Sequence, residues 1–264
     1  MQIQQIRNGT NKIVYGDTTF LLDPYLGEKG ALGTLGDISG QPYKTPDPVK
    51  MQLPMPFYPL PDPIGTILEH VDYYLFTSLA PDHIDRAADG TVGALLDKKI
   101  PALVQNETDA ALLRKSGFAD VRVVSEEGTE LGEITLVKTA TCHGKIIPTG
   151  DAMGVVLLKE GEKALYVAGD TIWYEGVRQV LQDFKPRVVM VNGCAAALLG
   201  CGRLSMDDED IESVSRNLPD AVVYVTHMDN DAAACITRHE MRGRLTNRGV
   251  TSYIMPRDGQ TIHF

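Results

Sequence analysis

Short apolar runs separated by turn residues dominate the hydrophobic pattern of the chain. Residues 12–15 and 18–22 are β-rich runs on either side of the turn pair Gly16-Asp17, a pattern that predicts a hairpin near the start. Further strands are predicted at residues 71–76, 102–105, 121–124, 134–141, 154–159 and 164–168. This close succession indicates a sheet-rich middle of the chain.

Helical and strand patterns alternate in the last third. The predicted elements are a helix from about Tyr174, a strand at residues 188–191, a helix capped by Ser205, a strand at 221–226 and a helix from Thr237. Asn106 and Gly117 bound an earlier helix, while Thr237 and Glu240 have the spacing of a capping box. Helices alternating with strands favour α/β layers, although the pattern leaves the topology open.

Eight of the fifteen prolines lie between Pro42 and Pro63, interleaved with large apolar residues. Such a stretch cannot be regular helix or central strand, so a loop insertion is predicted at about residues 27–66. One interpretation is a surface loop. The other is an apolar flap over a site, or a contact between subunits of a homo-oligomer, because long loops in compact domains are usually functional or disordered.

Composition indicates an ordinary globular protein. The chain has 264 residues, of which 43% are hydrophobic and 23% charged, and a single domain spanning residues 1–264 is the simplest prediction. The apolar runs are too short for a membrane span and the start does not resemble a signal peptide, so a cytoplasmic location is expected. A net charge of −10 argues against general nucleic-acid binding, and four irregularly spaced cysteines are expected to be reduced thiols.

Three of the six histidines, His83, His143 and His227, follow predicted strands beside acidic or glycine residues. Asp82 and His83 are adjacent in one loop, where a carboxylate and an imidazole can bind the same metal ion. Taken alone, this pair is a weak signal, since Asp82 could simply cap a helix. The other three histidines are expected to be structural or solvated.

Further ligand-type residues also stand at strand ends: His143 before Gly144, Asp170 after Gly169, and His227 after a strand that ends at residue 226. Ligands from separate strand ends that converge on one rim are the usual way in which α/β folds build sites. The sequence therefore predicts one site that gathers these side chains.

The order of these motifs resembles the metallo-β-lactamase superfamily over nearly the whole chain. The motifs are Asp23-Pro24, Asp82-His83, His143-Gly144, Gly169-Asp170-Thr171 and His227. Within the superfamily, the chain looks like bacterial cytoplasmic metal-dependent hydrolases related to ascorbate-phosphate lactonases, with similar stretches at residues 6–10, 21–24, 166–171 and 205–210. The resemblance implies a four-layer αββα sandwich with a dinuclear metal site at one edge.

The resemblance also implies the ligand set. Asp82, His83, Asp170 and His227 match the ligands of the family's second metal, with Asp170 bridging both ions. The first metal would use His143 and the two leading histidines of the motif His-x-His-x-Asp-His, which in this chain are replaced by Ser78 and Ala80. A reduced site with one divalent metal is therefore expected, with zinc favoured and manganese, iron or nickel as alternatives.

The implied activity is hydrolysis of a small-molecule ester, lactone or phosphodiester by a metal-activated water, with His143 and Asp82 as catalytic residues. A pseudoenzyme that binds a metabolite or partner is the alternative. Cys194 is a conceivable replacement for the missing histidine ligands, and Cys142 is a weaker candidate. The alternative interpretation is that both cysteines are small buried residues without a role in metal binding.

Two further chemistries receive less support from the sequence. A Ser78 nucleophile with His83 and Asp85 lacks the nucleophile elbow and leaves the other ligand-type residues unexplained. No nucleotide cofactor is expected, because the loop that begins at Gly200 has Ser205 where the third glycine of a dinucleotide-binding motif would stand.

Overall fold

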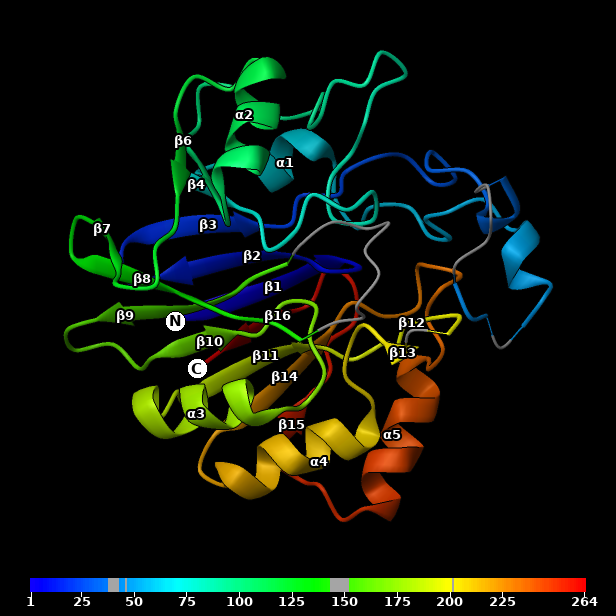
Figure 1. The fold of residues 1–264 in the computed structure, drawn as a ribbon, viewed down its shortest axis with the longest axis vertical. Helices are drawn as coiled ribbons and strands as arrows, with labels where there is room; N and C mark the ends of the chain where they lie inside the picture. The colour runs from blue at the N-terminus through cyan, green and yellow to red at the C-terminus, as the bar shows by residue number, and fades with distance from the viewer. Residues whose placement is uncertain (38–42, 46, 143–151, 201) are drawn as a thin grey trace.

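Two mixed β-sheets form the centre of the molecule in a computed structural model that describes residues 1–37, 43–45, 47–142, 152–200 and 202–264 (Figure 1). In spatial order the first sheet contains β16 (Thr261–His263), β1 (Gln2–Arg7), β2 (Thr10–Tyr15), β3 (Thr18–Leu22), β4 (Tyr73–Leu75), β5 (Ala102–Val104) and β6 (Val121–Val123). Pairing is antiparallel from β16 to β3 and parallel from β3 to β6. The turn at Gly16-Asp17 between β2 and β3 confirms the predicted hairpin.

The second sheet repeats this division into a parallel and an antiparallel half. In spatial order it contains β15 (Tyr253–Ile254), β14 (Val222–Thr226), β11 (Val188–Asn192), β10 (Leu165–Val167), β9 (Gly154–Lys159), β8 (Ile134–Thr139) and β7 (Thr129–Leu131). Strands β15 to β10 pair in parallel, and β10 to β7 pair antiparallel. The parallel halves matter for function because their carboxyl ends lie at one edge.

Helices cover the outer face of each sheet (Figure 1). Helices α1 (Ile64–Leu68) and α2 (Glu107–Lys115) lie over the first sheet, and α3 (Glu175–Phe184), α4 (Asp208–Asn217) and α5 (Arg238–Asn247) lie over the second. A buried apolar layer that includes Phe20, Leu136 and Met190 fills the space between the sheets. The predicted four-layer αββα arrangement is thereby confirmed.

The described part of the proline-rich segment lies at one end of the sandwich, beside the small hairpin of β12 (Ala197–Leu198) and β13 (Gly202–Arg203) (Figure 1). It contains two 3₁₀ turns, η1 (Leu35–Asp37) and η2 (Lys50–Gln52). Isolated bridges join Gly33 to Met55 within the segment and Tyr43 to Leu198 of β12. Backbone pairing therefore attaches the segment to the body of the protein.

Two local predictions were wrong or incomplete. Strand β1 was not predicted, because Gln5 and Arg7 interrupt the apolar pattern; both are nevertheless buried. Helix α4 is capped by Asp207 and not by Ser205: the Asp207 carboxylate accepts the backbone N–H groups of residues 209 and 210. The Ser205 hydroxyl accepts the N–H of Ala196 instead, so it holds the β12–β13 hairpin.

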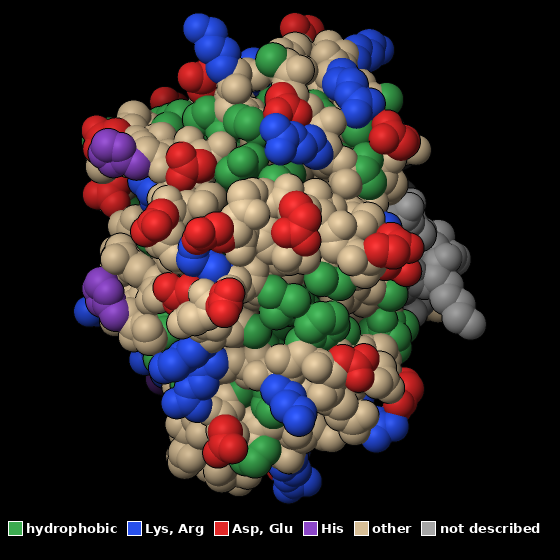
Figure 2. Space-filling view, turned by 90° about the vertical axis from the view of Figure 1, so that its left-hand side faces the viewer, with side chains coloured by type: hydrophobic (Ala, Val, Ile, Leu, Met, Phe, Trp, Pro, Cys, Tyr) green, Lys and Arg blue, Asp and Glu red, His purple; other side chains and the backbone are tan. Residues whose placement is uncertain are grey.

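Exposed large hydrophobic side chains are concentrated near the proline-rich end. Val49, Leu53 and Tyr58 belong to that segment, and Leu199 belongs to the adjoining hairpin. The side of the molecule at the left of Figure 1 faces the viewer in Figure 2, where acidic and basic side chains are interspersed around a central area of hydrophobic ones. Among the described residues, no helix is both long and apolar enough to cross a bilayer.

Candidate metal centre

Side chains from several strand ends meet at the edge where the two parallel half-sheets finish. Asp23 follows β3, His83 lies in the loop after β4, Asp170 follows β10 and His227 follows β14, while Asn192 is the last residue of β11. Because parallel strands direct their carboxyl ends to one edge, this topology collects residues that are up to 204 positions apart, from Asp23 to His227.

Asp23 organises the loop that carries His83. Its Oδ1 accepts the backbone N–H of Thr77 at 2.7 Å, and its Oδ2 accepts the Thr77 hydroxyl at 2.5 Å. The same Oδ2 lies 2.9 Å from Nδ1 of His83, whose side chain is fully buried. A carboxylate beside Nδ1 favours the tautomer that carries its proton there, which leaves the Nε2 lone pair directed into the site.

Among the described residues, the side chains of Asp82, His83 and His227 form a group that could hold a metal ion, here called the metal-binding group: their donor atoms lie within 4.8 Å of one another. Nε2 of His227 is 3.2 Å from Nε2 of His83 and 3.3 Å from Oδ2 of Asp82. Two imidazole nitrogens and a carboxylate oxygen are typical ligands of zinc and similar divalent ions.

Asp170 adds a second carboxylate beside this group. Its Oδ2 lies 3.2 Å from Nε2 of His83, and its Oδ1 accepts a hydrogen bond from Nδ2 of Asn192 at 2.7 Å. The preceding Gly169 has a φ of +67°, and an added Cβ would lie 2.3 Å from the carbonyl oxygen of Met153. Only glycine therefore fits at the turn that brings Asp170 to the site.

The N-terminal segment places His227. Its backbone N–H bonds to the carbonyl oxygen of Asn8 at 3.0 Å, and it has a positive φ of 61°. A Cβ on Gly9 would lie 2.8 Å from the His227 ring, so the backbone approaches closely there. On the far edge of the ring, Cys194 Sγ lies 3.7 Å from Nδ1.

The ionisable groups of the cluster shift one another's pKa values. Burial lowers the pKa of His83, but the carboxylates of Asp23, Asp170 and Asp82 outweigh burial and raise that pKa well above its ordinary value. Burial also lowers the pKa of His227, but the hydrogen bond to Asp82 and the neighbouring Cys194 and Asp170 outweigh burial. The pKa of His227 therefore also lies well above its ordinary value. Burial raises the pKa of Asp170, but the two imidazoles bring it well below its ordinary value. The imidazoles and carboxylates of the cluster therefore stabilise one another's charged forms.

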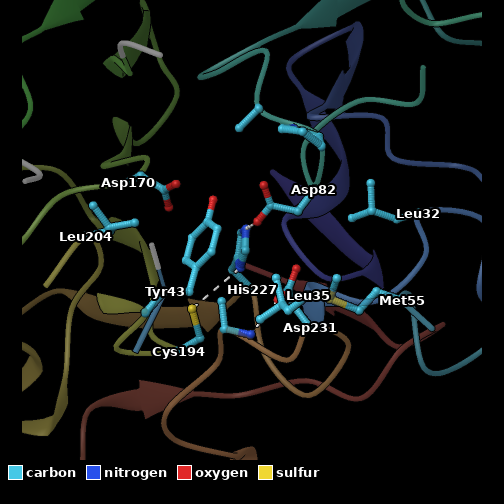
Figure 3. A pocket seen from close by; sticks show the side chains of 14 residues that line it. Leu32, Leu35, Tyr43, Met55, Asp82, Asp170, Cys194, Leu204, His227 and Asp231 are labelled. Atoms are coloured by element: carbon cyan, nitrogen blue, oxygen red, sulfur yellow. Dashed lines mark hydrogen bonds and ion pairs between the residues drawn. The ribbon is translucent and has the colours of Figure 1, made fainter. Parts of the chain in front are cut away.

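A pocket with a volume of about 180 Å³ opens onto this cluster (Figure 3). Asp82, Asp170 and His227 line it together with Tyr43 and Asp231. Burial, and then the neighbouring Asp82, raise the pKa of the Asp231 carboxyl to about 6. Apolar side chains supply most of the remaining wall, several of them from the proline-rich segment.

The predicted site residues Asp82, His83, Asp170 and His227 are brought together, whereas His143 lies outside the described residues. Cys194 is buried beside His227 but faces the ring edge opposite to Asp82, so it does not join the metal-binding group.

The two other side chains considered as alternatives are placed differently. Cys142 is exposed, which corrects the interpretation of it as a small buried residue. Ser78 Oγ accepts the N–H of Ala80, and Asp85 accepts the N–H groups of residues 26 and 27. Asp85 is therefore engaged away from His83, which pairs with Asp23.

Sequence reasoning missed several residues of the site. It quoted Asp23 within a motif without assigning it a role and did not single out Asn192, although both stand where a strand ends, the signal that located Asp170. Asp231 lies in the short acidic run after His227, a weaker signal. Tyr43 lies in the irregular proline-rich segment, where no periodicity indicates which side chain points inward.

No family model matches the chain, but one named relative resembles it along its full length and another over about half of it. It is 35% identical over 269 residues to the UPF0173 protein YddR of Bacillus subtilis (strain 168), and the match covers all of both proteins. It is 26% identical over 132 residues to a UPF0173 metal-dependent hydrolase of Koribacter versatilis (strain Ellin345), which covers 47% of the chain and 54% of that relative.

Solved structures agree with the fold. The isothiocyanate hydrolase from Delia radicum gut bacteria has a TM-score of 0.88 at 32% identity, covering 100% of the chain and 99% of that structure. A protein described as a possible metal-dependent hydrolase from Veillonella parvula DSM 2008 has the same TM-score at 31% identity, covering 99% and 98%. The metallo-β-lactamase fold protein YhfI of Bacillus subtilis has a TM-score of 0.63 at 10% identity over 99% and 98%, which supports the fold alone. The likeness to ascorbate-phosphate lactonases and the loss of a motif stay predictions.

Proposed function

The chain belongs to the UPF0173 metal-dependent hydrolase family, and on that premise we propose that it hydrolyses a small molecule at the site of Asp82, His83, Asp170 and His227. One observation carries this proposal: the donor atoms of Asp82, His83 and His227 converge within 4.8 Å at the edge of a pocket. Relatives with metal-dependent hydrolase in their names support it.

The donor set fits a divalent metal. Nε2 of His83 and Nε2 of His227 face each other at 3.2 Å, with carboxylate oxygens of Asp82 and Asp170 alongside. Two imidazoles and two carboxylates suit zinc best, with manganese, iron or nickel as alternatives. We expect one ion, since the resemblance to the superfamily places Ser78 and Ala80 at the positions where its motif has histidines.

The bound ion would supply Lewis acidity that makes a water molecule nucleophilic near neutral pH. The chain supplies orientation: Asp23 holds the proton of His83 on Nδ1, and Asn192 fixes the carboxylate of Asp170. The apolar walls exclude bulk water from the reacting atoms. Asp82 and His143 are the proposed groups for accepting and returning protons, although His143 lies outside the described residues.

Several electrophiles are candidate substrates. Esters, lactones and phosphodiesters are the classes implied by the superfamily resemblance. The structural relative that hydrolyses isothiocyanates, at 32% identity over the full chain, adds that class. All of these classes present an electrophilic carbon or phosphorus centre to water, so one activated-water site can serve any of them.

The test combines metal analysis with turnover. Protein purified without chelators is analysed for bound metal, and metal-loaded protein is then assayed with benzyl isothiocyanate, phenyl acetate, a lactone and a phosphodiester. We expect about one ion per chain and turnover of at least one substrate. His227→Ala should abolish both metal retention and turnover, since it removes an imidazole ligand.

His239→Ala is the matched control, because His239 is exposed on α5 and belongs neither to the metal-binding group nor to the residues that line the pocket. That variant should retain metal and activity. Protein that binds no divalent metal even after supplementation would overturn the proposal. Metal binding without turnover of any substrate would favour a binding protein instead.

A further inference from the structure

The described residues that line the pocket give it an excess of negative charge. Three carboxylates, those of Asp82, Asp170 and Asp231, face it, and these lining residues include no lysine or arginine. One divalent ion would neutralise two of the three negative charges when the imidazoles are neutral. An anionic substrate would then meet a site with residual negative charge, and electrostatic repulsion in a partly buried pocket weakens binding.

The rest of the wall is apolar and the space is small. Leu32, Leu35, Met55, Ala196, Leu204 and Ala233 surround a volume of about 180 Å³. A cavity of similar size, about 150 Å³ and lined by aliphatic and aromatic side chains, is large enough for benzene. The dimensions therefore suit a substituent of about one ring, and the apolar lining favours one without charged groups.

Tyr43 supplies the uncharged polar group of this pocket. Its backbone is fixed by the bridge to Leu198 and by the hydrogen bond from the N–H of Lys44 to the carbonyl oxygen of Ala197, at 2.8 Å. Its side chain extends from there into the pocket, and in the view of Figure 3 the hydroxyl lies between the carboxylates of Asp170 and Asp82. No hydrogen bond to another described residue occupies this hydroxyl, which leaves it available to a ligand.

The Tyr43 phenol is protonated at neutral pH, because the ordinary pKa of a tyrosine is about 10. The group is therefore a hydrogen-bond donor throughout the neutral range and brings no charge of its own. A neutral donor beside a nucleophile site can stabilise negative charge that develops on a substrate atom.

We infer that this pocket takes an uncharged electrophile with a small apolar substituent, and that the Tyr43 hydroxyl donates a hydrogen bond to the substrate heteroatom on which negative charge develops. The inference rests on the proposed hydrolase function and narrows its substrate class. Neutral esters, lactones and isothiocyanates satisfy it, whereas phosphodiesters, which carry a charge, do not.

Binding of a matched ligand pair tests the substrate class without requiring turnover. Acetophenone and benzoate have nearly the same shape and both present a carbonyl oxygen, but only benzoate is charged. Titration calorimetry of the metal-loaded protein should give an affinity for acetophenone at least about tenfold higher than for benzoate. Equal or tighter binding of benzoate, or binding of neither ligand, would overturn the inference.

Tyr43→Phe tests the hydroxyl. It should weaken acetophenone binding several-fold and lower kcat for benzyl isothiocyanate by on the order of 100-fold, with a smaller change in KM, because the donor acts mainly on developing charge. Tyr58→Phe is the control: Tyr58 is 56% exposed on the same segment, and its loss of a hydroxyl should change neither value. If Tyr43→Phe left both kcat and the acetophenone affinity unchanged, the Tyr43 hydroxyl would have no role in binding or turnover.

The two failures are distinguishable. If the protein turns over no substrate with any metal but still binds acetophenone in a Tyr43-dependent manner, the hydrolase proposal fails and the pocket assignment stands. If it hydrolyses a phosphodiester faster than neutral esters and isothiocyanates, the hydrolase proposal stands and this inference is wrong.

Discussion

Oδ2 of Asp23 lies 2.9 Å from Nδ1 of His83, and both side chains are buried. The same carboxylate holds the backbone and hydroxyl of Thr77, so one residue fixes both the course of the loop after β4 and the tautomer of its histidine. Because Asp23 binds Nδ1 of His83, Nε2 of His83 is available to bind a metal ion.

Asp23→Asn should weaken metal binding by about 10- to 100-fold, since outer partners of ligating histidines typically contribute that much to affinity. The amide can offer its oxygen to His83 but cannot accept with the strength of a carboxylate. Competition with a chromogenic chelator measures the change. Asp17→Asn, in the exposed hairpin turn, is the control. If Asp23→Asn bound metal as tightly as Asp17→Asn, Asp23 would have no role in orienting His83.

Cys194→Ala should retain the metal with an affinity reduced far less than in His227→Ala. Cys194 Sγ lies 3.7 Å from Nδ1 of His227 and 3.3 Å from the Ser205 hydroxyl, so the thiol supports the imidazole from outside the ligand cluster. Cobalt-loaded wild-type protein should accordingly lack a thiolate-to-cobalt charge-transfer band. Such a band, lost in Cys194→Ala, would instead make Cys194 a ligand.

Arg7→Met should destabilise the fold by about 2–4 kcal/mol, because it leaves buried carbonyl groups without a donor. The Arg7 guanidinium donates to the carbonyl oxygens of Tyr25 and Gly27 and, at 3.1 Å, to that of Tyr58, so it joins both ends of the proline-rich segment. Urea unfolding measures the loss. The exposed Arg257→Met is the control, and equal stability of the two variants would contradict this role.

The convergence of Asp82, His83, Asp170 and His227 could be predicted from the sequence, because each stands beside a recognisable strand end. Asp170 and His227 follow apolar runs directly, and the parallel topology then brings the carboxyl ends of those strands to one edge. The four-layer fold was predictable for a related reason: its strands and helices have clear hydrophobic periods, and the order of the motifs resembles a known superfamily.

The pocket walls could not be predicted in the same way. Tyr43 faces the site because its backbone pairs with Leu198, a contact between residues 155 positions apart in a segment without periodicity. Gln5 and Arg7 are polar yet buried: the Thr226 hydroxyl donates to the Gln5 side chain, and the Arg7 guanidinium donates to the carbonyl oxygen of Gly27. Their strand therefore does not match a simple alternating pattern. Long-range pairing of this kind becomes visible only in the folded chain.

Acid stability should depend on Asp208, which joins α4 to α5. Its carboxylate accepts hydrogen bonds from Arg244, at 3.1 Å, and from Arg248. Burial raises the pKa of Asp208, but the hydrogen bonds from the two arginines outweigh it, so the folded-state pKa lies below the ordinary value. The stabilisation is therefore fully present above the ordinary aspartate pKa of about 4 and is lost as the pH falls through the lower folded-state value.

Asp208→Asn removes this dependence. The variant should be less stable than the wild type at neutral pH, and the difference should shrink as the pH falls below about 4, where the wild-type carboxylate takes up its proton. Urea midpoints measured across that range give the comparison. Asp220→Asn, an exposed residue in the turn after α4, is the control and should follow the wild type. A stability difference for Asp208→Asn that stays constant with pH would show that the side chain contributes through packing and not through its charge.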